Sequence, residues 1–368
     1  MAREEKFNFD ITPEYFKRIN IYPYIPYEIA LLFTNYEYYN YYIPQKIEEN
    51  YKKLDKKYLD KLPFKYQDKV NKVKEGMKIN QAFFSKIASL YLDKFNYVKL
   101  TDKEIADFQH SEMNFVGKIY LEFLTREWAD EGKEEREKTI APVIQELKRY
   151  YDYENKSVMD KGVNVLVLGA KFFRVVYELA KLGYNIEANE YNYFYLMVAN
   201  YLFNYAKKKE LCICPRISSF CSSFTEESVT RKHYIPDEDI FADLSNLNKD
   251  RIKITKQEFE VEYNNTQDKF DCVLTVFSTD DYKNLISFTE NVNKVLKKGG
   301  IWINIGGLSN TYSGYGGIDL TWDEWKHVIM HSGFDIKREE KPVVPYCKIK
   351  GHSLPFTLGA VFFTAQKK

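Results

Sequence analysis

The stretch VNVLVLGAKFFRVVYELAKLGYNIEANE, residues 163–190, decides the fold. An apolar run at residues 165–168 ends at Gly169 and predicts a short buried strand. Apolar side chains then recur at helical spacing over residues 174–182, and Gly183 ends that helix. The stretch therefore begins with a strand, a glycine turn and a helix.

The same stretch closes with a second strand, predicted at residues 184–188, and an acidic residue, Glu190, just beyond it. An acid about 20 residues after the glycine turn is typical of a nucleotide-cofactor half-fold, where it accepts the ribose hydroxyls. The turn itself is altered, however. A Gly-x-Gly-x-Gly loop would let the backbone approach the cofactor, but Lys171 and Phe173 stand at the second and third glycine places.

The rest of the carboxyl-terminal half alternates strands and helices, which predicts an α/β fold with a mostly parallel, doubly wound sheet. Ligands of such sheets bind beyond the carboxyl ends of the strands. That edge collects Gly169, Glu190 and residues 277–280 and 306–310. The predicted helices are 191–206, 283–296 and 322–331, the strands are 212–217, 270–277, 301–305, 334–339 and 358–366, and a polar insertion is expected at 218–250.

Three regions are expected along the chain. Residues 1–35 form an aromatic arm, residues 36–155 a helical domain, and residues 156–368 the Rossmann-like domain. Within the helical domain the pattern breaks at Pro63. Helices are predicted at 117–128 and 134–151, with Pro142 in an early turn of the second.

Composition narrows the class of protein. The net charge of +1 gives no basic field for nucleic acid, and no apolar run is long enough for a transmembrane segment. Acidic residues near the start argue against a signal peptide, so an intracellular, cytoplasmic location is the default and a mitochondrial one stays open. The five cysteines predict reduced thiols and no metal site. The 31 tyrosines and 26 phenylalanines would suit contacts with other protein subunits.

Several motifs match a known family in order. They are LTREW at 124–128, EGKEER at 131–136, VLVLGA at 165–170, LGY at 182–184, NEY at 189–191 and VLKKGGIWIN at 295–304. With these motifs the chain, from about residue 33 onward, resembles the carnosine N-methyltransferase family. The resemblance implies a class I S-adenosylmethionine-dependent fold behind a helical domain, and methyl transfer to an imidazole nitrogen of a His-containing dipeptide. The sulfonium cofactor is already activated, so such a protein mainly aligns the two reactants.

The resemblance also implies roles for particular residues. Arg126 matches an arginine near the cofactor carboxylate, and Gly169 and Glu190 match the first loop glycine and the ribose-binding acid. Residues 258–259, Glu258 and Phe259, match an Asp-Phe pair at the adenine end. Asp280 matches the carboxylate that grips the substrate.

The chain departs from the family elsewhere. Phe123 replaces a glutamine, Lys171 and Phe173 replace glycines, and Thr311 replaces a substrate histidine. Residues 356–358 (Phe356, Thr357 and Leu358) replace tyrosines that line the pocket. A Phe173 ring turned inward would fill the methionine end of the cofactor site. We therefore expect a degenerate methyltransferase that binds S-adenosylmethionine weakly or not at all and serves as a structural or accessory subunit. The alternatives are an active N-methyltransferase for a small imidazole compound or for a protein histidine.

Simpler roles stay open for the same side chains. Glu190 could cap the helix that begins at residue 191, and Asp280 the helix from residue 283. Lys171 could be a solvated lysine or meet an anion, and Arg126 could form a salt bridge between domains. The Gly-rich residues 314–317 are expected to be a flexible loop.

Overall fold

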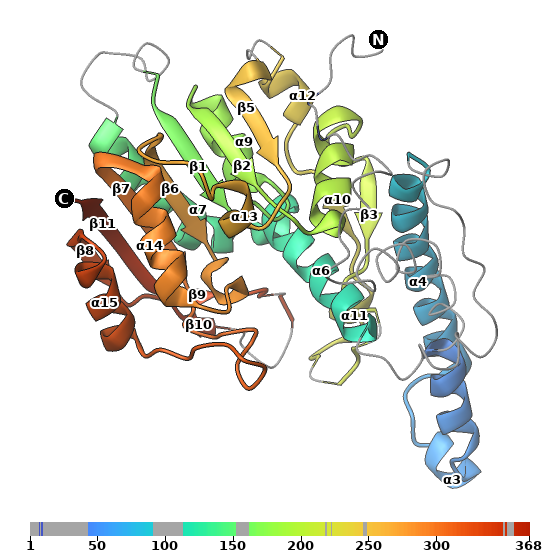
Figure 1. Cartoon of the computed structure of the whole chain (residues 1–368). Coiled ribbons are helices and arrows are strands. Elements are labelled where there is room, and N and C mark those ends of the chain that lie inside the picture. Colours follow the sequence, from blue (N-terminus) through green and yellow to red (C-terminus); the bar gives the residue numbers. More distant parts are fainter. Residues whose placement is uncertain are drawn as a thin grey trace.

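The computed structural model describes residues 7, 9, 43–90, 113–151, 162–217, 219–221, 223–245, 249–348, 350–351 and 357–368 (Figure 1). Of the predicted arm, residues 1–35, only Phe7 and Phe9 lie within this set. Among the helices in these described ranges, none combines the length and apolarity that crossing a membrane requires.

A seven-stranded sheet forms the centre of the molecule. Its strand order is β5-β2-β1-β6-β7-β11-β8, and only β11 runs antiparallel to its two neighbours. A parallel sheet with one inverted strand inserted near its edge is the arrangement of class I methyltransferases, so the predicted fold class is confirmed. In chain order the strands are β1 (Asn164–Leu168), β2 (Asn185–Asn189), β5 (Ile252–Thr255), β6 (Phe270–Val276), β7 (Leu296–Gly306), β8 (Phe334–Glu340) and β11 (Val361–Lys367).

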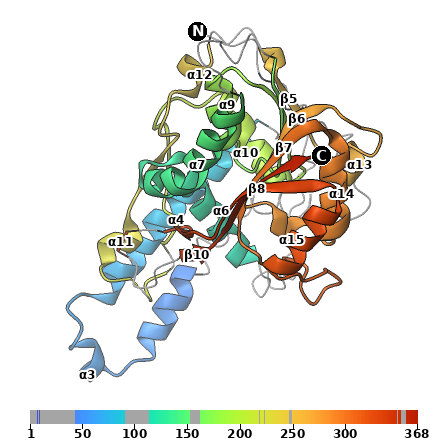
Figure 2. The same ribbon diagram turned by 90° about the vertical axis from the view of Figure 1, so that its left-hand side faces the viewer.

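Helices cover both faces of the sheet because alternate strand residues point to opposite faces. In β1, Val165 and Val167 belong to one core cluster, whereas Leu166 and Leu168 belong to the other. Figure 2 shows α7 and α9 on one side of the sheet and α14 and α15 on the other. The first face packs against α6 (Met113–Trp128), α7 (Lys133–Tyr151), α9 (Arg174–Lys181) and α10 (Tyr193–Asn204), and the second against α13 (Phe259–Glu262), α14 (Leu285–Val295) and α15 (Trp322–His331).

The amino-terminal helices lie partly outside this body. Residues 43–52 are helical, and Pro63 separates α3 (Lys56–Leu59) from α4 (Tyr66–Ala88), as predicted. The outer end of α4 and α3 extend away from the sheet (Figure 1). Side chains of α6 and α7 share one core with β1, so a domain boundary near residue 155 stays a prediction.

Several predicted elements differ from the structure. The strand predicted at 212–217 is β3 (Leu211–Ile213), and it pairs with β4 (His233–Ile235) in a separate two-stranded sheet. The predicted insertion therefore contains β4, with α11 (Glu226–Thr230) and α12 (Ile240–Asp243), while the edge strand β5 was not predicted. The short 3-10 turns are η1 (Asp130–Gly132), η2 (Lys249–Arg251) and η3 (Thr279–Asp281).

Two further predictions near the carboxyl end of the fold and in α7 were wrong in detail. The strand predicted at 358–366 is two strands, because β10 (Thr357–Gly359) pairs with β9 (Val343–Pro345) before β11 begins. Pro142 lies in the interior of α7 rather than in an early turn, although the start of that helix was predicted to within one residue.

Candidate functional site

The candidate site lies where the strand order changes direction. The chain runs from β1 outward through β2 to β5, then returns to β6 on the other side of β1. Ligands of doubly wound sheets bind in the crevice at such a switch point, beyond the carboxyl ends of the strands. Gly169 follows β1, and Ser278 lies two residues after β6. The two loops touch: the Ser278 hydroxyl donates to the Leu168 carbonyl at 2.8 Å, and a β-carbon on Gly169 would meet Ser278 Cβ at 2.4 Å.

The loop from Gly169 to Phe173 keeps a glycine-type backbone without the later glycines. Gly169 has φ of 65°, Lys171 of 48° and Phe173 of 66°, all in the left-handed region. A side chain in this region costs roughly 1–2 kcal/mol. The conformation is held by neighbours: the Trp128 indole Nε1 donates to the Phe172 carbonyl at 2.8 Å, and the Phe173 amide donates to the Ala170 carbonyl at 2.8 Å.

The Phe173 ring does not enter the crevice. It is fully buried on the opposite side, 6.0 Å from the Phe203 ring and 5.3 Å from the Phe9 ring between centroids. The inward orientation considered for this ring, which would fill the methionine end of the cofactor site, is therefore not the one found. The left-handed backbone of Phe173 directs its side chain into the core beneath α10.

Lys171, in contrast, spans the crevice. Its side chain is buried, and its ammonium Nζ lies 3.8 Å from Asp281 Oδ2. Burial alone would lower the pKa of this ammonium, but the Asp281 and Asp280 carboxylates outweigh burial and raise the pKa above its usual range. The expectation of a solvated lysine is wrong. A cation from the loop after β1 pairs instead with a carboxylate from the loop after β6.

Glu190 is buried and accepts two backbone hydrogen bonds. Its Oε2 accepts from the Lys171 amide at 2.7 Å and its Oε1 from the Asn192 amide at 2.8 Å. Burial, with a smaller contribution from the nearby Asp281, raises the pKa of Glu190 to about 7. The side chain that caps α10 is Asn192, which accepts from the Phe194 amide at 2.9 Å. Glu190 thus ties the altered loop to the start of α10.

Arg126 lies on the other side of the loop, surrounded by aromatic rings and carboxylates. Its guanidinium is 4.8 Å from the Phe123 ring and 5.6 Å from the Tyr346 ring, and Nη2 lies 3.1 Å from Glu127 Oε1. Nε is 3.8 Å from Glu135 Oε1, so its ion pairs stay within α6 and α7. Nη1 is buried and has no hydrogen-bond partner.

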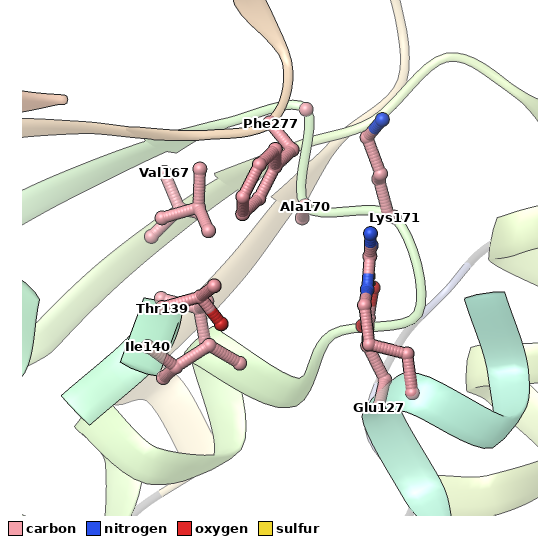
Figure 3. A pocket seen from close by; sticks show the side chains of 11 residues that line it. Glu127, Thr139, Ile140, Val167, Ala170, Lys171 and Phe277 are labelled. Atoms are coloured by element: carbon pink, nitrogen blue, oxygen red, sulfur yellow. Dashed lines mark hydrogen bonds and ion pairs between the residues drawn. The ribbon is translucent and has the colours of Figure 1, made fainter. Parts of the chain in front are cut away.

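A small cavity of about 20 Å³ lies beside Arg126 and Lys171. In Figure 3, Lys171 and Glu127 stand on one side of it, with Val167, Phe277 and Ile140 on the other. A cavity of this size has room for about one water molecule. It could hold part of a carboxylate beside Arg126, but it is far too small for a nucleoside.

The structure brings together Asp280 and Thr311, the two positions for which the resemblance implies substrate contacts. The Thr311 amide donates to the Asp280 carbonyl at 3.0 Å, so the loop after β7 lies against the loop after β6. Burial raises the pKa of Asp280 to about 6, while Lys171 lowers it and Asp281 raises it. Asp280 does not cap α14, because Asn284 accepts from the amides of the first turn at 3.0 and 3.3 Å.

The positions matched to the family's pocket tyrosines and to its Asp-Phe pair lie in different surroundings. Leu358 lies against Gly307, where an added β-carbon would meet Leu358 Cδ2 at 3.0 Å, so β10 reaches the end of β7. Phe356 lies outside the described residues. Glu258 is exposed at the start of α13 without a side-chain cap hydrogen bond, and the Phe259 ring is buried 5.6 Å from the Phe288 ring. The structure thus places Phe259 in the core.

Sequence reasoning did not single out Asp281 and Tyr120, which contact predicted site residues or their neighbours. Asp281, the residue after Asp280, pairs with Lys171. The Tyr120 hydroxyl accepts from Asn192 Nδ2 at 3.1 Å, and its ring stacks on Phe194 at 4.2 Å. A tyrosine-rich sequence offers no signal to single out Tyr120, whereas the paired acids after β6 were a usable signal for Asp281.

The five cysteines are free, and Cys214, Cys272 and Cys347 are buried. Among the described residues, no group of three or more histidine, cysteine and acidic side chains is arranged to hold a metal ion. Burial raises the pKa of the Cys214 thiol to about 12, as expected of a structural thiol.

Comparisons with known proteins agree with the resemblance. The family described as carnosine N-methyltransferase matches residues 102–368. Carnosine N-methyltransferase of Dictyostelium discoideum is 27% identical over 82% of this chain and 66% of its own length. The protein named Carnosine N-methyltransferase unmet of Drosophila melanogaster is 30% identical over 59% of this chain and 47% of its own length. The matched part thus spans about half to two thirds of these relatives.

Among solved structures, TehB from Haemophilus influenzae is similar at 14% identity, with a TM-score of 0.36 over 60% of this chain and 66% of that one. A likeness this distant says nothing about the reaction. The match across most of the chain, the ordered motifs and the strand order with its inverted strand lead to one conclusion: the chain belongs to the carnosine N-methyltransferase family.

Proposed function

We propose that this protein is a carnosine N-methyltransferase-like protein that has lost catalysis and serves as an accessory subunit of a larger protein assembly. The observation that carries the proposal is the contact of Lys171 with Asp281, at 3.8 Å, across the switch point of the sheet. The crevice in which a ligand of this fold would lie is bridged by the protein's own side chains.

Charge makes this bridge unfavourable for S-adenosylmethionine. The cofactor carries a positive sulfonium, and the raised pKa of Lys171 keeps its ammonium protonated at neutral pH. Like charges repel, so this ammonium opposes a sulfonium in the same crevice, and the Asp281 and Asp280 carboxylates beside Lys171 offset only part of that repulsion.

The residues present fit the cofactor at one end only. Arg126, with its unpartnered buried Nη1, suits a carboxylate. Glu190 could receive a ribose only by sharing oxygens that already accept from the Lys171 and Asn192 amides. The buried Lys171 ammonium, whose pKa is raised, does not fit a sulfonium in the same crevice. We therefore propose that Arg126, Gly169, Glu190, Glu258, Phe259 and Asp280 are vestigial site residues.

The accessory role rests on aromatic and apolar side chains at the surface, which suit protein contacts. Phe224, Tyr315 and Val343 are exposed by 74%, 84% and 71%. The net charge of +1 gives no support for a nucleic-acid partner. In native extracts the chain should migrate in an assembly well above its own 43.7 kDa, and migration as a free monomer would contradict the accessory role.

An active S-adenosylmethionine-dependent N-methyltransferase, acting on a carnosine-like dipeptide or a protein histidine, is the second candidate. The unpartnered Arg126 Nη1 favours it, because a buried donor without an acceptor is costly unless a ligand completes it. Asp280, against the Thr311 loop, would then hold the substrate imidazole.

Transfer of a labelled methyl group to carnosine separates the two candidates. We expect no transfer by the natural protein. Transfer that is lost in the Asp280→Asn variant would support the second candidate and overturn the proposed loss of catalysis. A Lys171→Gly variant serves as the matched test of the cause, since it removes the bridging cation and suits the left-handed backbone.

A further inference from the structure

Phe7 and Phe9 are buried against α10, although about 200 residues of chain separate them from that helix. Their exposed fractions are 8% and 2%. This contact lies away from the crevice. It involves Phe173, a residue of the same loop as Lys171.

Asn204, at the end of α10, holds the backbone of Phe7 at two points. Its Oδ1 accepts from the Phe7 amide at 2.8 Å, and its Nδ2 donates to the Phe7 carbonyl at 3.0 Å. The second hydrogen of Nδ2 is donated to Asn200 Oδ1 at 2.8 Å, which fixes the orientation of the amide. One side chain thus pairs with both backbone groups of a residue, as a neighbouring strand would.

The two phenylalanine rings occupy an aromatic pocket next to this clamp. The Phe7 ring meets the Phe203 ring edge-on at 5.7 Å. The Phe9 ring lies 5.3 Å from Phe173 and 6.1 Å from Phe203, and Phe203 also contacts Trp128 at 6.2 Å. These separations and tilts are favourable for aromatic pairs. Main-chain pairing and side-chain pockets together define a recognition site for a Phe-x-Phe segment.

We propose that Phe173, Phe203 and Asn204 form a docking site whose occupants are Phe7 and Phe9 of the same molecule, and that this docking holds the loop 169–173 in its present conformation. Phe173 belongs to both the site and the loop, with φ of 66°. A phenylalanine tolerates this backbone because its ring is buried between Phe9 and Phe203. The inference stands independently of whether the protein catalyses methyl transfer.

Hydrogen exchange tests the link between docking and loop. In a chain lacking residues 1–9, the amides of residues 172–174 should exchange at least about tenfold faster, while amides of β1 should not change. The full-length Phe9→Ala variant should show a smaller increase in the same amides. The matched control is Phe224→Ala, which removes a phenylalanine that is 74% exposed and should change nothing.

A peptide added to the shortened chain should restore docking. A synthetic peptide of residues 1–12, MAREEKFNFDIT, should bind the shortened chain saturably and return the loop amides to slow exchange, whereas the same peptide with Phe9→Ala should not. If the shortened chain fails to fold, the folded Phe9→Ala and Asn204→Leu full-length variants provide the loop measurement. Unchanged loop exchange in these variants, or no peptide binding to a folded shortened chain, would overturn the proposal.

Discussion

The aromatic core around Trp302 and the crevice around Lys171 lie on the same sheet but are built by different rules. Trp302 on β7 is fully buried, with the Phe363 ring 4.9 Å away and the Trp325 ring 5.8 Å away, in ordinary strand and helix conformations. The crevice combines left-handed side-chain residues, a buried lysine and carboxyls with raised pKa values. Regular packing thus stabilises the core of the sheet, whereas the edge at the switch point combines left-handed backbone with buried charged groups.

The largest expected effect lies in the core. Trp302→Ala should lower the free energy of unfolding by about 3–5 kcal/mol, because it leaves a cavity among packed rings. It also leaves the Thr275 hydroxyl without the indole donor at 2.9 Å. Urea unfolding followed by circular dichroism measures the loss. A decrease in the free energy of unfolding below about 1 kcal/mol would show that the packing around Trp302 contributes little to stability.

Next in size is the pH dependence of Glu190. Its pKa of about 7 in the folded chain lies above its usual 4.5, so the folded state binds the extra proton in between. Stability should therefore fall as the pH rises through this window, by up to about 3 kcal/mol, and Glu190→Gln should lack that slope. Unfolding of both proteins from about pH 5 to about pH 8 measures the difference.

Glu187 provides a matched control for this slope. Burial would raise its pKa, but Lys269 and Lys253 outweigh burial and lower it. The contribution of ionised Glu187 to the free energy of unfolding should therefore be present at neutral pH and decline as the pH falls. The Glu187→Gln variant should lack this decline. The same sign of slope for both residues would contradict the opposite directions of their pKa shifts.

The effect of Lys171 on ligand binding can be measured by comparing two ligands that differ in charge. Lys171→Met removes the cation but keeps a long side chain, so it should improve binding of S-adenosylmethionine by about 10- to 100-fold. It should leave binding of S-adenosylhomocysteine, whose sulfur is neutral, within about threefold. Thermal-shift titration of both ligands gives the ratio. Equal gains for the two ligands would indicate a steric rather than an electrostatic barrier.

The smallest effect is expected at Tyr315, which is 84% exposed between Gly314 and Gly316. Tyr315→Ala should change the free energy of unfolding by no more than about 0.5 kcal/mol. Thermal unfolding of the isolated chain would detect a larger loss, which would show that the loop after β7 packs on the body.

The regular elements of the fold were predicted more accurately from the sequence than the loop at the switch point. Helices such as α15 and strands such as β6 were predicted almost to their ends, because their apolar spacing and capping residues agree with the fold. The edge strand β5 was missed, since it follows an irregular polar insertion. At the site, Gly169 and Glu190 were predicted next to one loop, as found.

What the sequence could not give was the direction of side chains in that loop. Two roles were open for Lys171, solvated or beside an anion, and the structure buries it beside Asp281. An inward Phe173 ring was considered, and the structure instead buries that ring beside Phe203. The outcome depends on partners remote in sequence, Asp281 for the lysine and Phe9 for the ring. No local pattern encodes such pairs.

Calorimetric titration of S-adenosylmethionine into the natural protein tests whether the Lys171–Asp281 pair excludes the cofactor from the crevice. If Lys171 and Asp281 close the crevice, no saturable heat should appear, corresponding to a dissociation constant weaker than about 1 mM. Saturable binding with a dissociation constant near about 1 μM would contradict the account, because it would require the bridge to open at little cost.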